Sequence, residues 1–492
     1  MPLLFISLRS PRAAWLSLLL LGATLVLSGG APPPASDTLA ARLDRVLRTS
    51  RAEPVFWGIY VRDVSSGRVL YERNADHAFL PASNQKLFTT AAALDALGST
   101  YRYETTLHFD GAVQDSIMRG DLIIRGSGDP SFGSVEIRSV DPLRVWAERL
   151  HAMGVRRIEG RLIGDDDVFD DRPYPEGWDV DYITSQASRS MGTTTSGLAY
   201  RDNVVVVRIR ATRPGAPPSV ETIPEGAVTI NNEATTSARR YGAGVRVTRS
   251  FQSNAINVIG SVPRYYRGSV VVPVVNPTLF AVESFRLALE EAGIETDVAA
   301  IDIDDLSDKP NTRGIDPLFV ALSPPLADLI AITNKESNNF YAEQIFRTYG
   351  WAGSVRGGAN RTETFLRRAG IDTRPLLIRD GSGLSRKDLT TPRALVDLLV
   401  YMDKHRERDA FQASLALGGE PQTTMEYRLR NVPVQAKTGS LRFIRTLSGY
   451  ATRPDGSRVA FALFANNYTG PSYRVTNTFD EIVRTLTSPA TS

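Results

Sequence analysis

The chain contains 492 residues, of which 42% are hydrophobic and 23% are charged, with a formal net charge of +3 and no cysteine. This length allows two or three domains with well-buried cores, and the composition is ordinary for a soluble globular protein, which excludes bulk disorder. The lack of cysteine excludes disulfides, thiol chemistry and thiolate metal sites, and a nearly neutral chain has no sequence-wide attraction to nucleic acid.

The N-terminus has the pattern of a secretory signal. Arg9 and Arg12 precede a largely apolar run over residues 13–27, and small residues follow up to Gly30. Positive, apolar and small segments in this order predict a signal peptide over residues 1–30, cleaved near Gly30, and therefore an exported protein. The alternative is a membrane anchor, but a run of fifteen residues is shorter than the roughly 20 needed to span a bilayer. We expect no transmembrane segment in the mature chain.

Hydrophobic periodicity predicts the elements of the first part of the mature chain. A helix over residues 37–48 is followed by a β-hairpin over 55–71, and a helix rich in Ala and Leu runs over 84–97. From residue 101 to 276, short β-branched runs alternate with turns rich in Gly, Pro and Asp, and one helix interrupts them at 141–153. This texture predicts a mainly β insert of one or two subdomains over residues 101–276.

Helices dominate again from residue 277, and strands return near the C-terminus. Helices are predicted over residues 277–292, 325–347, 361–369, 392–404 and 475–486. Two strands, over 446–452 and 458–464, flank the turn Pro454-Asp455-Gly456, which is typical of a hairpin. Strands at both ends of the chain predict an α+β domain built from residues 31–100 and 277–492. The strands near the two ends of the chain would form its sheet, and the insert would interrupt the domain in sequence.

Lysine is rare in this chain, and arginine carries almost all the positive charge. Only lysine can lose its proton near neutral pH in a suitable site, so each lysine that remains is a candidate for chemistry. The six lysines are Lys86, Lys309, Lys335, Lys387, Lys404 and Lys437.

Ser83 and Lys86 lie at the predicted start of the helix over 84–97. One turn apart, the two side chains share a helix face, where the unpaired N–H groups of the helix N-terminus stabilise an alkoxide-like oxygen. A lysine held in a dry pocket can lose its proton and act as a base toward the serine. The pair is a candidate nucleophile and base, although a helix-capping serine followed by a solvated lysine gives the same pattern.

Two further motifs have both catalytic and ordinary interpretations. Ser337-Asn338-Asn339 offers a hydroxyl and an amide that can converge on a pocket only from a turn between two helices. Lys437-Thr438-Gly439-Ser440 offers a cation and hydroxyls for a substrate carboxylate, and its glycine allows close backbone approach. Taken alone, each motif is equally an Asn-rich helix junction or a turn that leads into a strand.

In this order, Ser83-x-x-Lys86, Ser337-x-Asn339 and Lys437-Thr438-Gly439 form the signature set of penicillin-binding proteins and serine β-lactamases. The long, mostly β segment between the first two motifs resembles the low-molecular-mass class C penicillin-binding proteins, the D-alanyl-D-alanine carboxypeptidase/endopeptidase family. Further stretches resemble that family: residues 81–86, 120–122, 126–130, 380–385 and 436–439. The resemblance covers nearly the whole mature chain and implies a penicillin-binding domain with an antiparallel sheet flanked by helices.

The resemblance implies a two-step acyl transfer. Ser83 would attack the carbonyl between two D-Ala residues, or between D-Ala and the cross-linking amino acid, while Lys86 takes its proton. Backbone N–H groups of Ser83 and Ser440 would form the oxyanion hole. Ser337, with Lys437 nearby, would protonate the leaving amine, and water would then hydrolyse the acyl-enzyme.

The resemblance also implies how ligands are held. Asn339 would bind the substrate amide, Thr438 and Ser440 would bind its terminal carboxylate, and residues 380–385 would line the site as a loop. The implied partners are peptidoglycan stem peptides and, as covalent inhibitors, β-lactam antibiotics. No cofactor or metal is implied, and the expected location is the periplasm or cell envelope.

Two positions depart from the family pattern: Asn338, where Asp is frequent, and Ser440, where Thr is frequent. Ser440 keeps the hydroxyl, so activity is expected to survive. The charge missing at Asn338 leaves the pH optimum and the substrate preference open.

Three other functions fit parts of the sequence. A β-lactamase needs a group that activates the deacylating water, and no glutamate motif of that kind stands out. A non-catalytic wall-binding or β-lactam-sensing protein would not need the intact motif set. A histidine-dependent hydrolase is disfavoured because the chain has no Gly-x-Ser-x-Gly elbow and its four histidines lie outside the motifs, without metal-ligand spacing: His77, His108, His151 and His405. The balance of carboxypeptidase and endopeptidase activity and the oligomeric state stay open.

Overall fold

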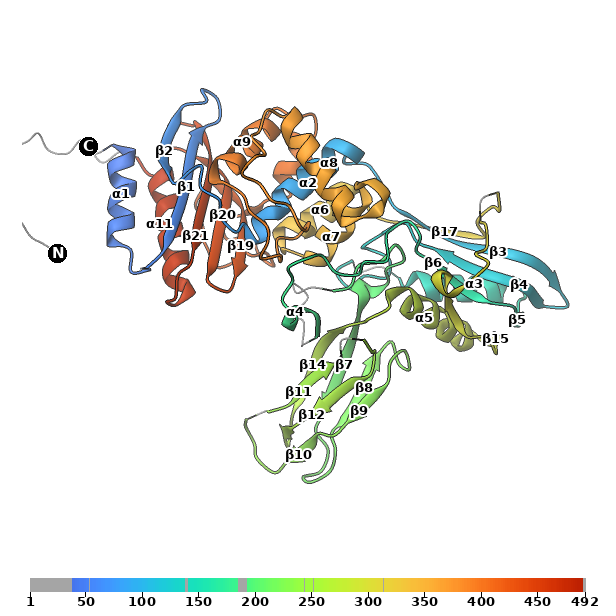
Figure 1. Ribbon diagram of the computed structural model, residues 1–492. Helices are drawn as coiled ribbons and strands as arrows, with labels where there is room; N and C mark the ends of the chain where they lie inside the picture. Colours follow the sequence, from blue (N-terminus) through green and yellow to red (C-terminus); the bar gives the residue numbers. More distant parts are fainter. Residues whose placement is uncertain are drawn as a thin grey trace, which may run out of the picture.

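A computed structural model describes residues 38–489 except 53, 138–139, 185–192, 243, 251 and 313 (Figure 1). The signal peptide predicted over residues 1–30 lies outside the described residues. Within the part that is described, no helix combines the length and the apolar character needed to cross a membrane.

One sheet of six strands joins the two ends of the described chain. Its order is β18-β19-β20-β21-β1-β2, and every neighbouring pair is antiparallel. The strands are β1 (Phe56–Asp63), β2 (Val69–Arg73), β18 (Ala416–Leu417), β19 (Val434–Leu441), β20 (Ile444–Thr452) and β21 (Arg458–Asn466). Because β1 pairs with β21 along its whole length, the first and last strands of the chain lie side by side, as the sequence predicted.

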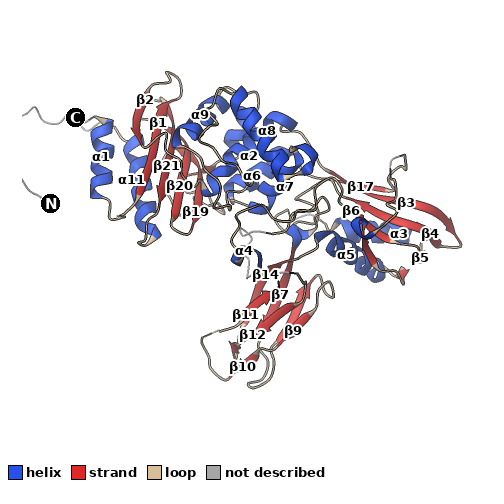
Figure 2. Ribbon diagram, viewed as in Figure 1, coloured by secondary structure: helices blue, strands red, loops and turns tan. Residues whose placement is uncertain are grey.

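Helices cover both faces of this sheet (Figure 2). On one face lie α1 (Leu39–Thr49) and α11 (Ser472–Thr487); on the other lie α2 (Gln85–Leu97), α6 (Leu326–Lys335), α7 (Asn339–Thr348), α8 (Val355–Arg368), α9 (Pro392–Met402) and α10 (Arg408–Ala413). The period of two in a strand separates the two cores. In β21, Phe461 and Leu463 pack on the α1/α11 side, whereas Ala462 and Phe464 pack on the α2/α9 side. All four are fully buried, which fixes the register of the central strand.

The insert leaves the helical side of this domain and contains several smaller sheets (Figure 1). One sheet contains β3 (Glu104–Gln114), β4 (Ile117–Arg125), β5 (Arg157–Glu159), β6 (Leu162–Asp165), β15 (Glu295–Thr296), β16 (Ala300–Asp302) and β17 (Phe319–Leu322). The others contain β7 (Val204–Arg210), β8 (Ser219–Ile223), β9 (Ile230–Asn232), β10 (Thr235–Ser237), β11 (Arg246–Arg249), β12 (Ile256–Ile259), β13 (Ser261–Pro263) and β14 (Arg267–Pro273). Helices α3 (Pro142–Ala152), α4 (Asp181–Thr184) and α5 (Pro277–Glu291) complete it.

The packing differs from the boundary expected at residue 276. Helix α5 packs against α3, and Phe285 lies in the same core as Trp146. Strand β17 pairs with β3, with Phe319 opposite Leu107. The sequence-based boundary followed the change from strands to helices, but the apolar face of α5 covers the insert's own sheet. We therefore propose that the insert ends near Leu322 and that the first domain resumes at α6.

Candidate active site

Ser83 lies in a short 3-10 turn, Ala82–Asn84, that leads directly into α2. Lys86 follows one turn later, is 0% exposed, and its Nζ lies 3.0 Å from the Ser83 Oγ. Ala82 has a φ of +46°, a left-handed conformation that an alanine rarely adopts. Such backbone strain concentrates at functional sites, where the surrounding structure holds it in place.

The second motif breaks the helix that the sequence predicted over residues 325–347. The structure has α6 and α7 instead, with Ser337 between them at a φ of +62°. Asn338 is the N-cap of α7, because its side chain accepts a hydrogen bond from the Tyr341 N–H at 3.1 Å. Asn339, the first residue of α7, places its Oδ1 2.5 Å from the Lys86 Nζ. Asn338 therefore has a capping role, which either Asn or Asp can perform.

The third motif lies on β19, beside the turn that carries Ser83. The Lys437 side chain is 0% exposed, and its Nζ donates to the Ser337 Oγ at 2.8 Å and to the Thr438 carbonyl at 2.8 Å. The Asn84 side-chain amide donates to the Lys437 carbonyl at 2.9 Å. This bond ties the strand to the turn that carries Ser83.

Gly439 is required by the close approach of this turn to the strand. A Cβ at position 439 would lie 2.0 Å from the Thr446 Oγ1 and 3.1 Å from both the Ser83 nitrogen and the Pro81 oxygen. The Thr446 hydroxyl already donates to the Pro81 carbonyl at 2.9 Å. A side chain here would therefore push the nucleophile away from β19.

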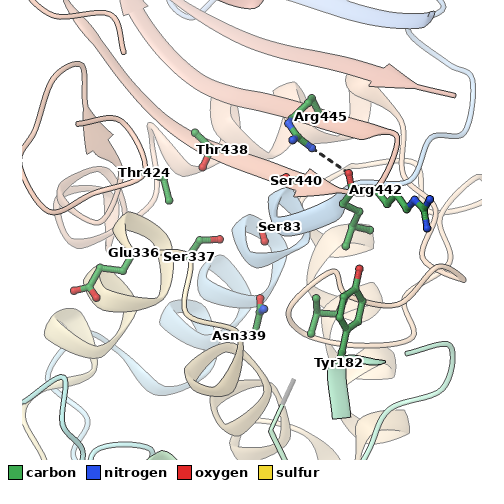
Figure 3. A pocket seen from close by; sticks show the side chains of 12 residues that line it. Ser83, Tyr182, Glu336, Ser337, Asn339, Thr424, Thr438, Ser440, Arg442 and Arg445 are labelled. Carbon is green, nitrogen blue, oxygen red and sulfur yellow. Dashed lines mark hydrogen bonds between the residues drawn. The ribbon is translucent and has the colours of Figure 1, made fainter. Parts of the chain in front are cut away.

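A cavity of about 410 Å³ opens over these residues (Figure 3). Five of the predicted site residues line it: Ser83, Ser337, Asn339, Thr438 and Ser440. The other three, Lys86, Lys437 and Gly439, lie behind its wall, because each is buried or covered by backbone. The structure thus brings all three motifs together at one cavity.

Seven other residues line the cavity: Tyr182, Glu336, Leu384, Thr424, Leu441, Arg442 and Arg445. Leu384 belongs to the loop over residues 380–385, which the sequence predicted to line the site. Tyr182 belongs to α4 of the insert, and no local pattern around it indicates a site residue. Tyr182 lines the cavity because this segment of the insert packs close to the Ser83 site.

Burial controls the protonation of both lysines. Desolvation lowers the pKa of Lys86 to about 7, against the opposing fields of Asp380 and Glu343. Burial, together with the neighbouring Lys86, also lowers the pKa of Lys437 well below its ordinary value. An amine that is neutral near pH 7 can accept a proton from a hydroxyl, which an exposed lysine cannot do.

The surroundings of Lys86 fit a neutral amine. Its Nζ contacts three oxygens: the Ser83 Oγ, the Asn339 Oδ1 and the Ser382 carbonyl, the last at 2.7 Å. The Asn339 and Ser382 oxygens are acceptors only, so they take the two hydrogens of an –NH2 group. The nitrogen lone pair is then directed at the Ser83 hydroxyl.

Carboxylates that could bind a metal lie elsewhere. Within the described residues, Asp166, Asp302 and Asp304 of the insert place one oxygen each within 4.8 Å of one another. The Lys309 ammonium group contacts Asp304 at 2.6 Å and offsets part of the negative charge. None of these side chains lines the cavity at Ser83.

A family model described as D-Ala-D-Ala carboxypeptidase 3 (S13) matches residues 39–487. The chain belongs to this family. The match confirms the resemblance inferred from the three motifs, and with it the α+β penicillin-binding fold and the serine DD-peptidase function.

Two relatives and two solved structures show how far the similarity extends. A D-alanyl-D-alanine carboxypeptidase of Actinomadura sp. is 31% identical over 94% of this chain and 87% of its own length. The D-alanyl-D-alanine carboxypeptidase DacB of Haemophilus influenzae is 27% identical over 84% of this chain and 85% of its own length. Penicillin binding protein 4 (dacB) from Haemophilus influenzae superposes with a TM-score of 0.76 at 24% identity, covering 90% of this chain and 98% of that one. A predatory peptidoglycan endopeptidase from Bdellovibrio bacteriovorus gives a TM-score of 0.51 at 16% identity, covering 88% and 94%.

The contact at Gly439 predicts a strong effect of a single methyl group. Gly439→Ala should slow the labelling of the protein by a fluorescent penicillin by about 100-fold, because a shift of about 1 Å between reacting groups has an effect of that size. The labelling rate would be measured by gel fluorescence over time. Gly470→Ala is the matched control, since a Cβ there meets nothing within 4 Å. An unchanged rate in Gly439→Ala would show that the strand and the turn can separate without loss of function.

Proposed function

We propose that this protein hydrolyses D-Ala-containing peptidoglycan stem peptides through an acyl-enzyme on Ser83. The observation that carries this proposal is the 3.0 Å contact between the Ser83 Oγ and the buried Lys86 Nζ at the cavity floor. The Ser337 and Lys437 pair, 2.8 Å apart on the other side of the cavity, supports it.

In the first step, the Ser83 oxygen bonds to the carbonyl carbon of the scissile amide, and the Ser83 proton passes to the Lys86 amine. Negative charge then develops on the former carbonyl oxygen. The backbone N–H groups of Ser83 and Ser440 would donate to this oxygen, and such donors contribute several kcal/mol, about 3 each. The approach of β19 to the nucleophile's turn supports this arrangement, because it brings the two N–H groups to one cavity.

In the second half of this step, the carbon–nitrogen bond breaks and the leaving amine takes a proton from the Ser337 hydroxyl. The Lys437 Nζ lies 2.8 Å from the Ser337 Oγ and holds that hydroxyl in place. The proton that Lys86 took from Ser83 can then replace the one that Ser337 gave, which restores both groups. Water hydrolyses the ester, which restores the Ser83 hydroxyl and releases the acid. β-Lactams would acylate Ser83 by the same route, and their ring-opened leaving group stays attached, so their release is slow.

The substrate would lie along β19. Asn339 contacts Lys86 through its Oδ1, and its Nδ2 group would donate to the substrate amide carbonyl. Thr438 and Ser440 lie on the cavity side of β19 (Figure 3) and would bind the terminal carboxylate. The predicted signal over residues 1–30 supports action in the periplasm or cell envelope, where these peptides are found.

The nucleophile can be tested by mass. The intact protein should gain the mass of one penicillin molecule, and Ser83→Ala should gain none, because Ser83 carries the hydroxyl that lies 3.0 Å from the Lys86 amine at the start of α2. Mass spectrometry after incubation with a fluorescent penicillin provides the measurement. Persistent labelling of Ser83→Ala would refute the assignment. Rapid turnover of the penicillin by the intact protein would indicate a β-lactamase instead.

The base can be tested by pH. Since burial lowers the pKa of Lys86 to about 7, the acylation rate should fall about tenfold per pH unit below that value, as Lys86 becomes protonated. Time courses of penicillin labelling between about pH 5 and 9 would measure this limb. Lys86→Arg is the control, because a guanidinium stays protonated and should give a very low rate without the limb. A limb at the ordinary pKa of a carboxyl group would assign the base to an acid instead.

The substrate can be tested with muropeptides. A pentapeptide ending in D-Ala-D-Ala should lose its last residue, and a cross-linked dimer should be cut at its D-Ala bond, both only with an intact Ser83. Chromatography of the digests measures the two activities and their ratio. If penicillin acylates Ser83 while neither peptide is cut, the protein is a β-lactam-binding or wall-binding protein rather than a peptidase.

A further inference from the structure

Three carboxyl groups lie behind the active site and take no part in the steps above. Glu343, Asp380 and Asp388 are each 0% exposed. Within the described residues, no ion pair within 4.0 Å joins any of them to a cation, although Lys86 is buried nearby. Burying carboxyl groups without such a partner is unfavourable unless hydrogen bonds satisfy them. Their hydrogen bonds therefore indicate what they stabilise.

Glu343 binds the backbone of the loop over residues 380–385. Its two oxygens accept from the Gly381 N–H, each at 3.1 Å, and Oε1 also accepts from the Ser382 N–H at 2.8 Å. Glu343 lies one turn after Asn339 on α7, so both side chains share the helix face directed at Lys86. Through Glu343, α7 therefore holds the same loop that contacts Lys86.

The loop over residues 380–385 is tightly packed on two sides. A Cβ at Gly381 would lie 2.5 Å from the Phe346 Cβ, and a Cβ at Gly383 would lie 1.9 Å from the Ala82 carbonyl oxygen. The loop therefore packs directly against α7 on one side and against the turn that carries Ser83 on the other. The Thr89 hydroxyl of α2 donates to the Gly381 carbonyl at 2.6 Å, which adds a second anchor.

Ser382 is the residue on which these contacts converge. Its N–H is bound by Glu343 at 2.8 Å, and its carbonyl accepts from the Lys86 Nζ at 2.7 Å. We propose that Glu343 is a positioning residue: it fixes the Ser382 carbonyl as a ligand of Lys86, so that the amine lone pair is directed at Ser83. This inference rests on the acylation mechanism proposed above.

The charges around Lys86 add to this effect. Burial lowers the pKa of Lys86, and the carboxyl groups of Asp380 and Glu343 oppose this shift. Burial raises the pKa of Glu343 to about 8, and the backbone N–H bonds oppose that rise. Burial, and then the adjacent Asp380, likewise raise the pKa of Asp388 well above its ordinary value. Asp388 differs in its contact, because it accepts from the Arg379 N–H at 2.6 Å.

Glu343→Gln separates a positioning role from a merely structural one. The glutamine keeps the shape and one acceptor for the Ser382 N–H, but its –NH2 group cannot accept from the Gly381 N–H as the second carboxyl oxygen does. We expect the plateau rate of penicillin acylation to fall about 10- to 100-fold, since small misplacements of reacting groups have effects of this size. The acid limb of the pH–rate profile should also move to lower pH, because a Ser382 carbonyl that is no longer held in place stabilises the charged form of Lys86 less. A merely structural glutamate would change the melting temperature and leave the limb in place.

Two further variants complete the experiment. Thr89→Val removes the second anchor of the loop, so it should lower the rate and move the acid limb in the same direction. Asp388→Asn is the matched control, because this buried carboxyl group accepts from the Arg379 N–H and not from the Ser382 N–H, so it should change neither. If Glu343→Gln does not fold, Thr89→Val decides: wild-type acylation in that variant contradicts the positioning role.

The possible failures are distinguishable. If the wild-type protein is not acylated at Ser83, the proposed function is wrong. If it is acylated and Glu343→Gln shows the same plateau rate and the same acid limb, the function stands and the positioning role of Glu343 is wrong. A shifted limb in Asp388→Asn as large as that in Glu343→Gln would also overturn the inference, because it would assign the effect to the buried cluster in general.

Discussion

The complete burial of two lysines at one cavity is the constraint on which the rest of the site depends. Lys86 and Lys437 are each 0% exposed, and an amine in such a place is stable only when it is neutral or surrounded by oxygen acceptors. The acceptors come from separate parts of the chain. Ser337 and Asn339 lie at the start of α7, and Ser382 lies in the loop over residues 380–385. Folding must therefore bury these amines next to their acceptors before Ser83 can act as the proposed nucleophile.

The six-stranded sheet provides the rigid frame for this burial. Its central strands, β1, β20 and β21, come from opposite ends of the chain and have buried side chains on both faces. Strand β19 is held by β20 along its whole length and by the Asn84 side chain at the nucleophile's turn. Because each partner of Ser83 lies on a helix end or a strand rather than on a long loop, the distances between them are set by packing. This arrangement suits a reaction that requires three proton-handling groups in fixed positions.

The sequence indicated which motifs meet at the cavity better than it indicated their surroundings. The three motifs were recognisable because each needs particular side chains at fixed spacing, and the ordinary helices followed from their periodicity. The break at Ser337 was harder to place, because a positive φ in a serine depends on the tertiary contacts that hold it. Glu343 was not found at all, since a glutamate in a helix has no local signal of burial. The end of the insert is hard to place from sequence for the same reason: periodicity shows that α5 has an apolar face, but not which sheet it covers.

The insert is part of the active site and not only an attached module. Its segment near α4 contacts the loop that positions Lys86: the Trp178 indole N–H donates to Asp380 at 2.9 Å, and the Ser385 hydroxyl donates to the Glu176 carbonyl at 2.7 Å. A Cβ at Gly177 would lie 2.6 Å from the Ser385 Oγ, so the two segments are in direct contact. Tyr182 then forms part of the cavity wall (Figure 3). A peptide that enters the cavity therefore meets the insert as well as the catalytic domain. Changes in the insert can alter both the shape of the cavity and, through Asp380, the loop that holds the Ser382 carbonyl against Lys86.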